Sequence, residues 1–93
     1  MSLEDLRNQI DDIDAQLVEL LARRFQASLE ISAEKRRANH EIHDPERVDE
    51  VLAHIAAKNN GPISDEDLKK IFRKIIAIST EMQEQDRNGS YET

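Results

Sequence analysis

The sequence has no cysteine and no tryptophan, and its 93 residues include only two glycines, two prolines and three Phe or Tyr residues. Without cysteine the chain has no disulfide, no thiol nucleophile and no cysteine-ligated metal site. A base-stacking platform, a β-sandwich or a glycine-rich phosphate loop is hard to build from so few aromatics and glycines. The composition therefore favours an all-helical protein that is held by packing or by oligomerisation.

Basic residues are also scarce, because 13 Lys and Arg face 20 Asp and Glu and give a net charge of −7. Such a charge opposes attraction to nucleic acid or to an anionic membrane. No stretch approaches the ~18 apolar residues of a membrane span, and the first residues carry acids where a targeting peptide would be apolar. We therefore expect a cytoplasmic protein that binds neither nucleic acid nor membranes.

Three segments have the apolar spacing of α-helices. The first has Ser2 as its cap and extends to about residue 38, with Asn39 in the left-handed conformation. The second begins at Pro45, after an Asp44 cap, and ends at residues 59–62, which supply a left-handed cap and a proline. The third follows a Ser64 cap. Residues 84–93 lack apolar periodicity, so we expect the chain to fray from residue 84, with the tail itself set at about residues 86–93. We expect residues 1–93 to form a single domain.

The first of these helices is too long for a compact monomer. About 36 residues make a helix of ~54 Å, whereas a compact chain of this size is about 30 Å across. Its apolar seam would be bare unless another chain covered it. The sequence therefore predicts an intertwined homodimer of three-helix chains, with one long, one short and one medium helix in each. The seam consists of Leu3, Leu6, Ile10, Ile13, Leu17 and Leu20.

Polar residues interrupt the apolar faces of two helices. Arg24 occupies a seam position where an apolar residue is expected, and Ser28 and Lys35 lie on the same inward stripe. The apolar face of the third helix likewise continues into Ser79 and Gln83. Two cations on one stripe and two neutral hydrogen-bonding residues on another predict a cavity for a small anion.

A simpler interpretation of these residues remains open. Arg24 and Lys35 could pair with nearby acids, Arg47 could pair with Asp44 or Glu50, and the polar residues of the third helix could be partly exposed. His40 and His43 lie in a connection without the spacing of a preformed metal site, so we expect no metal. No nucleophile has an evident base.

The order and spacing of several residues along the chain resemble those of the all-helical class of chorismate mutases over about residues 3–85. The resemblance rests on Leu6-Arg7-x-x-Ile10-x-x-Ile13-Asp14-x-x-Leu17-x-x-Leu20-Leu21-x-x-Arg24, then Lys35, then Asp44-Pro45-x-Arg47, then Ile75-Ile76-x-x-Ser79-x-x-x-Gln83. It implies an intertwined dimer that rearranges chorismate to prephenate on the route to phenylalanine and tyrosine. A [3,3] shift of this kind needs no cofactor, metal or nucleophile.

The resemblance also implies a role for each matching residue. Arg24 and the Arg7 of the other subunit would clamp the two carboxylates of chorismate. Lys35 and Gln83 would donate hydrogen bonds to the ether oxygen whose bond breaks, which makes them catalytic together with Arg24. The remaining substrate-binding residues would be Ser79, for a carboxylate, and Asp44 with Arg47, beside the ring hydroxyl.

One position departs from the family pattern, because Val48 stands where glutamate is common. Isochorismate-pyruvate lyases share this helical fold and resemble the Pro45-Glu46-Arg47-Val48 string, so lyase activity is the enzymatic alternative. A non-catalytic regulatory or binding domain that acts on a shikimate-pathway enzyme is the alternative of a different class. Mutases of this class occur fused to, or in complex with, such enzymes.

Overall fold

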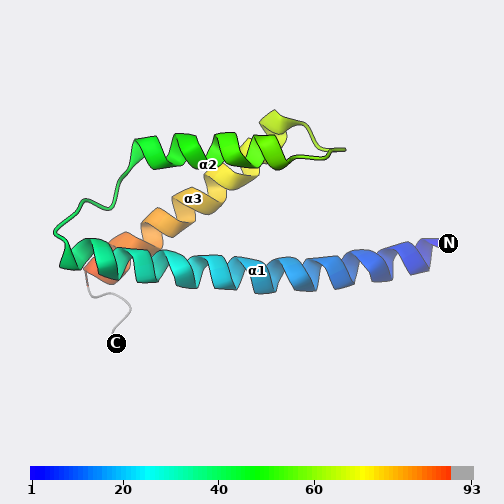
Figure 1. The fold of residues 1–93 in the computed structure, drawn as a ribbon. Helices are drawn as coiled ribbons and strands as arrows, with labels where there is room; N and C mark the ends of the chain where they lie inside the picture. The colour runs from blue at the N-terminus through cyan, green and yellow to red at the C-terminus, as the bar shows by residue number, and fades with distance from the viewer. Residues whose placement is uncertain (89–93) are drawn as a thin grey trace.

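The computed structural model of the chain describes residues 1–88, which form three helices: α1 (Leu3–Arg37), α2 (Pro45–Lys58) and α3 (Asp65–Arg87). Figure 1 shows α3 crossing between the other two helices and packing against the C-terminal half of α1. α2 packs on α3 from the other side. The predicted all-α class, with a long, a short and a medium helix, is confirmed.

Each helix begins at the predicted N-cap. The Ser2 hydroxyl accepts from the backbone N of Asp5 at 3.1 Å, and Asp5 in turn accepts from the backbone N of Ser2 at 3.2 Å. Asp44 accepts from the backbone N of Arg47 at 3.2 Å. Ser64 caps α3 in the same way. These bonds satisfy donors that the first turn of a helix leaves without a partner.

The predicted C-terminal ends of the helices agree less well with the structure than the predicted N-caps do. Asn39 has a φ of 62°, as predicted for the residue that follows α1. After α2, however, Asn59 is extended, and the left-handed residue is Gly61, with a φ of 71°. α2 therefore ends without a left-handed residue directly after its cap, and the turn to α3 is made further along the connection.

The prediction that the chain frays from residue 84 is wrong for residues 84–87, which continue α3. Polar contacts hold this last turn, and the apolar spacing on which the prediction relied cannot reveal them. His43 Nε2 lies 2.9 Å from a Glu84 carboxylate oxygen, and Arg36 pairs with Asp86 at 2.8 Å. The rest of the predicted tail, residues 89–93, lies outside the described residues.

The N-terminal half of α1 extends beyond the other two helices (Figure 1), and all of residues 1–20 are exposed. The radius of gyration is 16.4 Å, against about 12 Å for a compact chain of this length. Among the described residues, the buried apolar side chains are only Ile42 and Leu52. The predicted seam is 43% to 63% exposed in the single chain. An apolar surface of this extent is typical of a site that contacts another protein surface.

Over residues 1–88, none of the three helices is both long enough and apolar enough to cross a membrane.

Candidate active site

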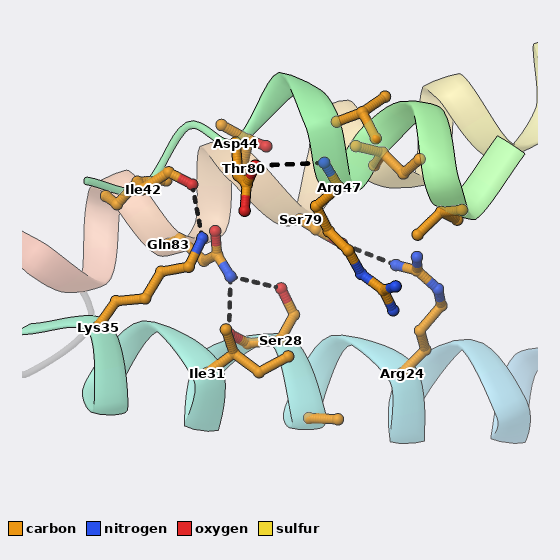
Figure 2. A pocket seen from close by; sticks show the side chains of 14 residues that line it. Arg24, Ser28, Ile31, Lys35, Ile42, Asp44, Arg47, Ser79, Thr80 and Gln83 are labelled. Carbon is orange, nitrogen blue, oxygen red and sulfur yellow. Dashed lines mark hydrogen bonds between the residues drawn. The ribbon is translucent and has the colours of Figure 1, made fainter. Parts of the chain in front are cut away.

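A cavity of about 260 Å³ lies between the C-terminal half of α1, the start of α2 and the C-terminal half of α3. Figure 2 shows side chains from all three helices, and from the connection that precedes α2, converging on it. The cavity brings together six of the seven predicted site residues: Arg24, Lys35, Asp44, Arg47, Ser79 and Gln83. Other lining residues include Ala27, Ser28, Ile31, Ile42, Val48, Val51, Ile76 and Thr80.

Arg24 lines the cavity without a charged partner in the described part of the chain. Its Nη1 donates to the Ser79 hydroxyl at 3.2 Å, and no carboxylate of residues 1–88 lies within ion-pair distance of it. Burial, and secondarily the positive charge of Arg47, lower the pKa of Arg24 from its ordinary value. Figure 2 shows the two arginine side chains extending toward the same region from α1 and α2. An anion placed there would offset both effects, because an opposite charge nearby favours the charged form of an arginine.

Lys35 has a neutral partner. Its Nζ donates to the backbone carbonyl of Ile42 at 3.0 Å, across the connection that joins α1 to α2 (Figure 2). Within the described part of the chain it makes no ion pair. The suggestion that Arg24 and Lys35 are paired with nearby acids is therefore wrong, and both charges are available to a ligand.

Arg47, the third cation of the lining, also has a partner that does not line the cavity. Arg47 Nη1 lies 3.3 Å from Glu50, in a pair whose side chains are 67% and 68% exposed. The simpler interpretation of Arg47, as a residue that pairs with Glu50, is thus confirmed, although Arg47 also lines the cavity. Asp44 is the only acid among the lining residues and serves as the cap of α2. The lining therefore carries three cations and one carboxylate, in a chain whose net charge is −7.

Ser79 and Gln83 are 6% and 7% exposed, so the alternative that they are partly exposed surface residues is wrong. Gln83 Nε2 donates to the carbonyl oxygen of Ser28 at 2.8 Å and to its hydroxyl at 3.0 Å. Ser28 is itself buried, at 8% exposure. This pair links α3 to α1 at the floor of the cavity (Figure 2).

Arg7 is the predicted site residue that the cavity of this chain does not contain. It lies within the exposed N-terminal part of α1. The loop histidines also lie away from the cavity lining. Residues 1–88 contain no group of three or more potential metal ligands.

Sequence reasoning assigned no site role to three lining residues that supply polar groups, namely Ser28, Thr80 and Ile42. Ser28 had a signal, because it falls on the inward stripe of Arg24 and Lys35, but its partner on α3 could not be known. Thr80 is adjacent to Ser79 and carried no separate signal. Ile42 contributes a backbone carbonyl, and side-chain patterns say nothing about that group.

Comparison with known proteins identifies the family. The family model described as "Chorismate mutase type II" matches residues 6–84. A bifunctional chorismate mutase/prephenate dehydratase of Pseudomonas aeruginosa is 32% identical over 80 residues, which are 81% of this chain and 22% of that protein. The protein of the same description from Aquifex aeolicus is 34% identical over 85 residues, 87% of this chain and 24% of that protein. This chain thus spans less than a quarter of these curated relatives.

Two solved structures of chorismate mutase from Thermus thermophilus share the fold over nearly their whole length. Form II has a TM-score of 0.87 at 30% identity and covers 89% of this chain and 94% of that one. Form I has a TM-score of 0.81 at 31% identity and covers 83% and 96%. With a family match over most of its length and the cavity described above, this chain belongs to the chorismate mutase type II family.

Proposed function

We propose that this chain catalyses the rearrangement of chorismate to prephenate, as an isomerase of phenylalanine and tyrosine biosynthesis. The observation that carries the proposal is the cavity, where a family member of net charge −7 gathers three cations around a single carboxylate. Chorismate is a dianion, and an overall negative protein repels it at long range. Its binding therefore depends on these local cations.

The residue types suit a reaction that needs positioning and electrostatics alone. A [3,3] shift requires a folded substrate conformation and donors directed at the negative charge that develops on the ether oxygen. In this proposal Arg24 holds one carboxylate, with Ser79 beside it, and Lys35 and Gln83 serve the ether oxygen. Asp44 and Arg47 lie at the start of α2, where the ring hydroxyl of chorismate would be bound. No cofactor or metal enters the reaction.

The second carboxylate is assigned to Arg7 of another subunit. Positions 7 and 24 are 17 residues apart on one continuous helix, which separates them by ~26 Å along its axis. One small molecule cannot contact both arginines of the same chain. An intertwined homodimer with shared sites accounts for this separation and for the exposed seam of α1. We also propose that residues 1–93 act as one domain.

The curated relatives suggest a partner. They are bifunctional proteins, and prephenate dehydratase is the second activity in their names. We propose that a shikimate-pathway enzyme of this kind, fused or separate, uses the product of this chain. The cytoplasmic location stays a prediction from the sequence.

Val48 favours the second candidate function, isochorismate-pyruvate lyase activity. It lines the cavity beside Arg47, and its side chain offers no hydrogen bond to a ring hydroxyl. Asp44 and Ser79 are more typical of a mutase, so we rank lyase activity second. A purely regulatory domain would bind chorismate in this cavity without consuming it.

One assay separates the three candidates. The purified chain is incubated with chorismate and, in parallel, with isochorismate, and substrate absorbance, prephenate and pyruvate are measured. Prephenate from chorismate supports the proposal, and pyruvate from isochorismate supports the lyase. Binding of chorismate without turnover identifies a regulatory domain and overturns the proposal.

A further inference from the structure

We propose that Ser28 is a positioning residue that orients the Gln83 amide for the reaction. The inference rests on the proposed mutase function and adds a residue to its site. Its basis is the buried contact in which Gln83 Nε2 donates both to the Ser28 carbonyl, at 2.8 Å, and to the Ser28 hydroxyl, at 3.0 Å.

This contact determines how the amide is turned when no substrate is present. A backbone carbonyl can only accept a hydrogen bond, so the nitrogen end of the Gln83 amide must face Ser28. Both hydrogen bonds donated by Nε2 are then made within the protein, and the oxygen end is turned away from Ser28. To donate to the ether oxygen of a substrate, the amide has to rotate and give up part of this contact.

The two acceptor groups of Ser28 differ in what they can do after that rotation. The carbonyl would face the amide oxygen of Gln83 and repel it. The hydroxyl can reverse its role, since it both accepts and donates, and can donate to the amide oxygen. No residue of the described chain accepts a hydrogen bond from the Ser28 hydroxyl, so its proton is available for this purpose. It would also polarise the amide and make its N–H a stronger donor.

The burial of the pair makes this assistance matter. Ser28 and Gln83 are 8% and 7% exposed, so water has little access to replace a lost partner. A buried amide oxygen without a hydrogen bond is unfavourable. Without the hydroxyl, the amide would remain in the orientation that the carbonyl favours, with its donors turned to α1. Ser28 therefore stabilises the orientation of Gln83 that serves the transition state.

The test is Ser28→Ala, with Ser32→Ala as its matched control. Ser32 lies one turn further along α1, is 0% exposed, and its hydroxyl has no hydrogen-bond partner in the described chain. It does not line the cavity. We expect Ser28→Ala to lower kcat/KM for chorismate about 2- to 10-fold, mainly through kcat, which is the worth of one hydrogen bond. Ser32→Ala should leave kcat/KM unchanged.

A double-mutant cycle with Gln83→Leu shows whether Ser28 acts through Gln83. If it does, Ser28→Ala should cost almost nothing further in the Gln83→Leu background. A loss of the same size in both backgrounds would mean that the hydroxyl serves the fold or contacts substrate directly, and would overturn the inference. So would a Ser28→Ala variant as active as wild type. Absence of turnover in wild type would instead refute the mutase function itself.

A pH profile gives a readout that a merely structural serine would not change. In Gln83→Glu, the hydroxyl of Ser28 can donate to the ionised carboxylate, which lowers the pKa of that carboxyl. Adding Ser28→Ala removes the donor, so the apparent pKa in the profile of kcat/KM should rise. Adding Ser32→Ala should not move it. Identical profiles for the two double variants would contradict the positioning role.

Discussion

Mixing two inactive variants tests the shared active site most directly. Arg7→Ala and Arg24→Ala each remove one of the two arginines proposed to clamp the substrate. The two positions are ~26 Å apart along α1, and Arg24 lines the cavity of its own chain whereas Arg7 does not. If each site takes Arg24 from one chain and Arg7 from the other, each homodimer of a variant is defective at both of its sites.

The expected activity of the mixture follows from counting sites. Equal amounts of the two variants that reassociate at random give about half heterodimers, each with one site that has both arginines and one that has neither. About one quarter of all sites are therefore intact in this mixture. Loss of one charged hydrogen-bonding partner costs about 1.5 to 3 kcal/mol, or about 10- to 150-fold in kcat/KM. The mixture should thus be clearly more active than either variant.

The assay follows chorismate absorbance after the variants have been unfolded together and refolded, with native mass spectrometry of a mass-tagged chain to count heterodimers. Variants refolded separately and then combined give the baseline. Arg23→Ala, which changes an exposed arginine outside the cavity lining, controls for loss of charge on α1. Heterodimers present in the expected amount, with activity no higher than the baseline, would refute the shared site.

Three further predictions concern single positions. Val48→Glu should raise kcat/KM for chorismate, because a charged hydrogen bond to the ring hydroxyl would add about 1 to 3 kcal/mol of transition-state binding. A folded variant with unchanged kinetics would mean that another group serves the hydroxyl. Gln83→Glu should be poorly active near neutral pH and recover as pH falls, since only the protonated carboxyl can donate. Its apparent pKa in the profile of kcat should exceed that of a free glutamate because the bound substrate is anionic, with Lys35 of the same cavity opposing that shift; parallel profiles for variant and wild type would remove Gln83 from the transition state. Leu17→Asp should give monomers in sedimentation and abolish turnover, because it places a charge in the exposed seam of α1. Asp12→Lys, on the opposite face of the helix, should do neither, and a dimeric Leu17→Asp would show that the seam is not the interface.

The helices could be predicted from the sequence because the determinants are local. Ser2, Asp44 and Ser64 each bond to a backbone N three residues later, as their positions before acidic or proline-containing turns indicate. The end of α3 could not be predicted, since its last turn is held by partners 41 and 50 residues away in the chain. Apolar spacing contains no information about such contacts.

The candidate site could likewise be predicted only in part from the sequence. Arg24 and Lys35 were predictable as inward-facing residues because their charges interrupt an apolar seam. What each of them contacts depends on how α3 and the connection at Ile42 pack against α1, and the sequence does not encode those distances in any local pattern. The hydrogen bonds between Gln83 and Ser28 join positions 55 residues apart and required the structure.

The exposed seam of α1 also determines how a newly made chain behaves. The last residue of α3 is synthesised 50 residues after the last residue of α1, an interval of about 3 to 10 s at ordinary rates of translation. Completing α3 does not bury the seam, because residues 1–20 remain exposed in the finished chain. If chains pair through this seam, as proposed above, the time that it stays open to proteases and to aggregation is set by encounters between chains, whose rate grows with their concentration. Rapid synthesis from a single messenger shortens that interval, and sparse synthesis prolongs it.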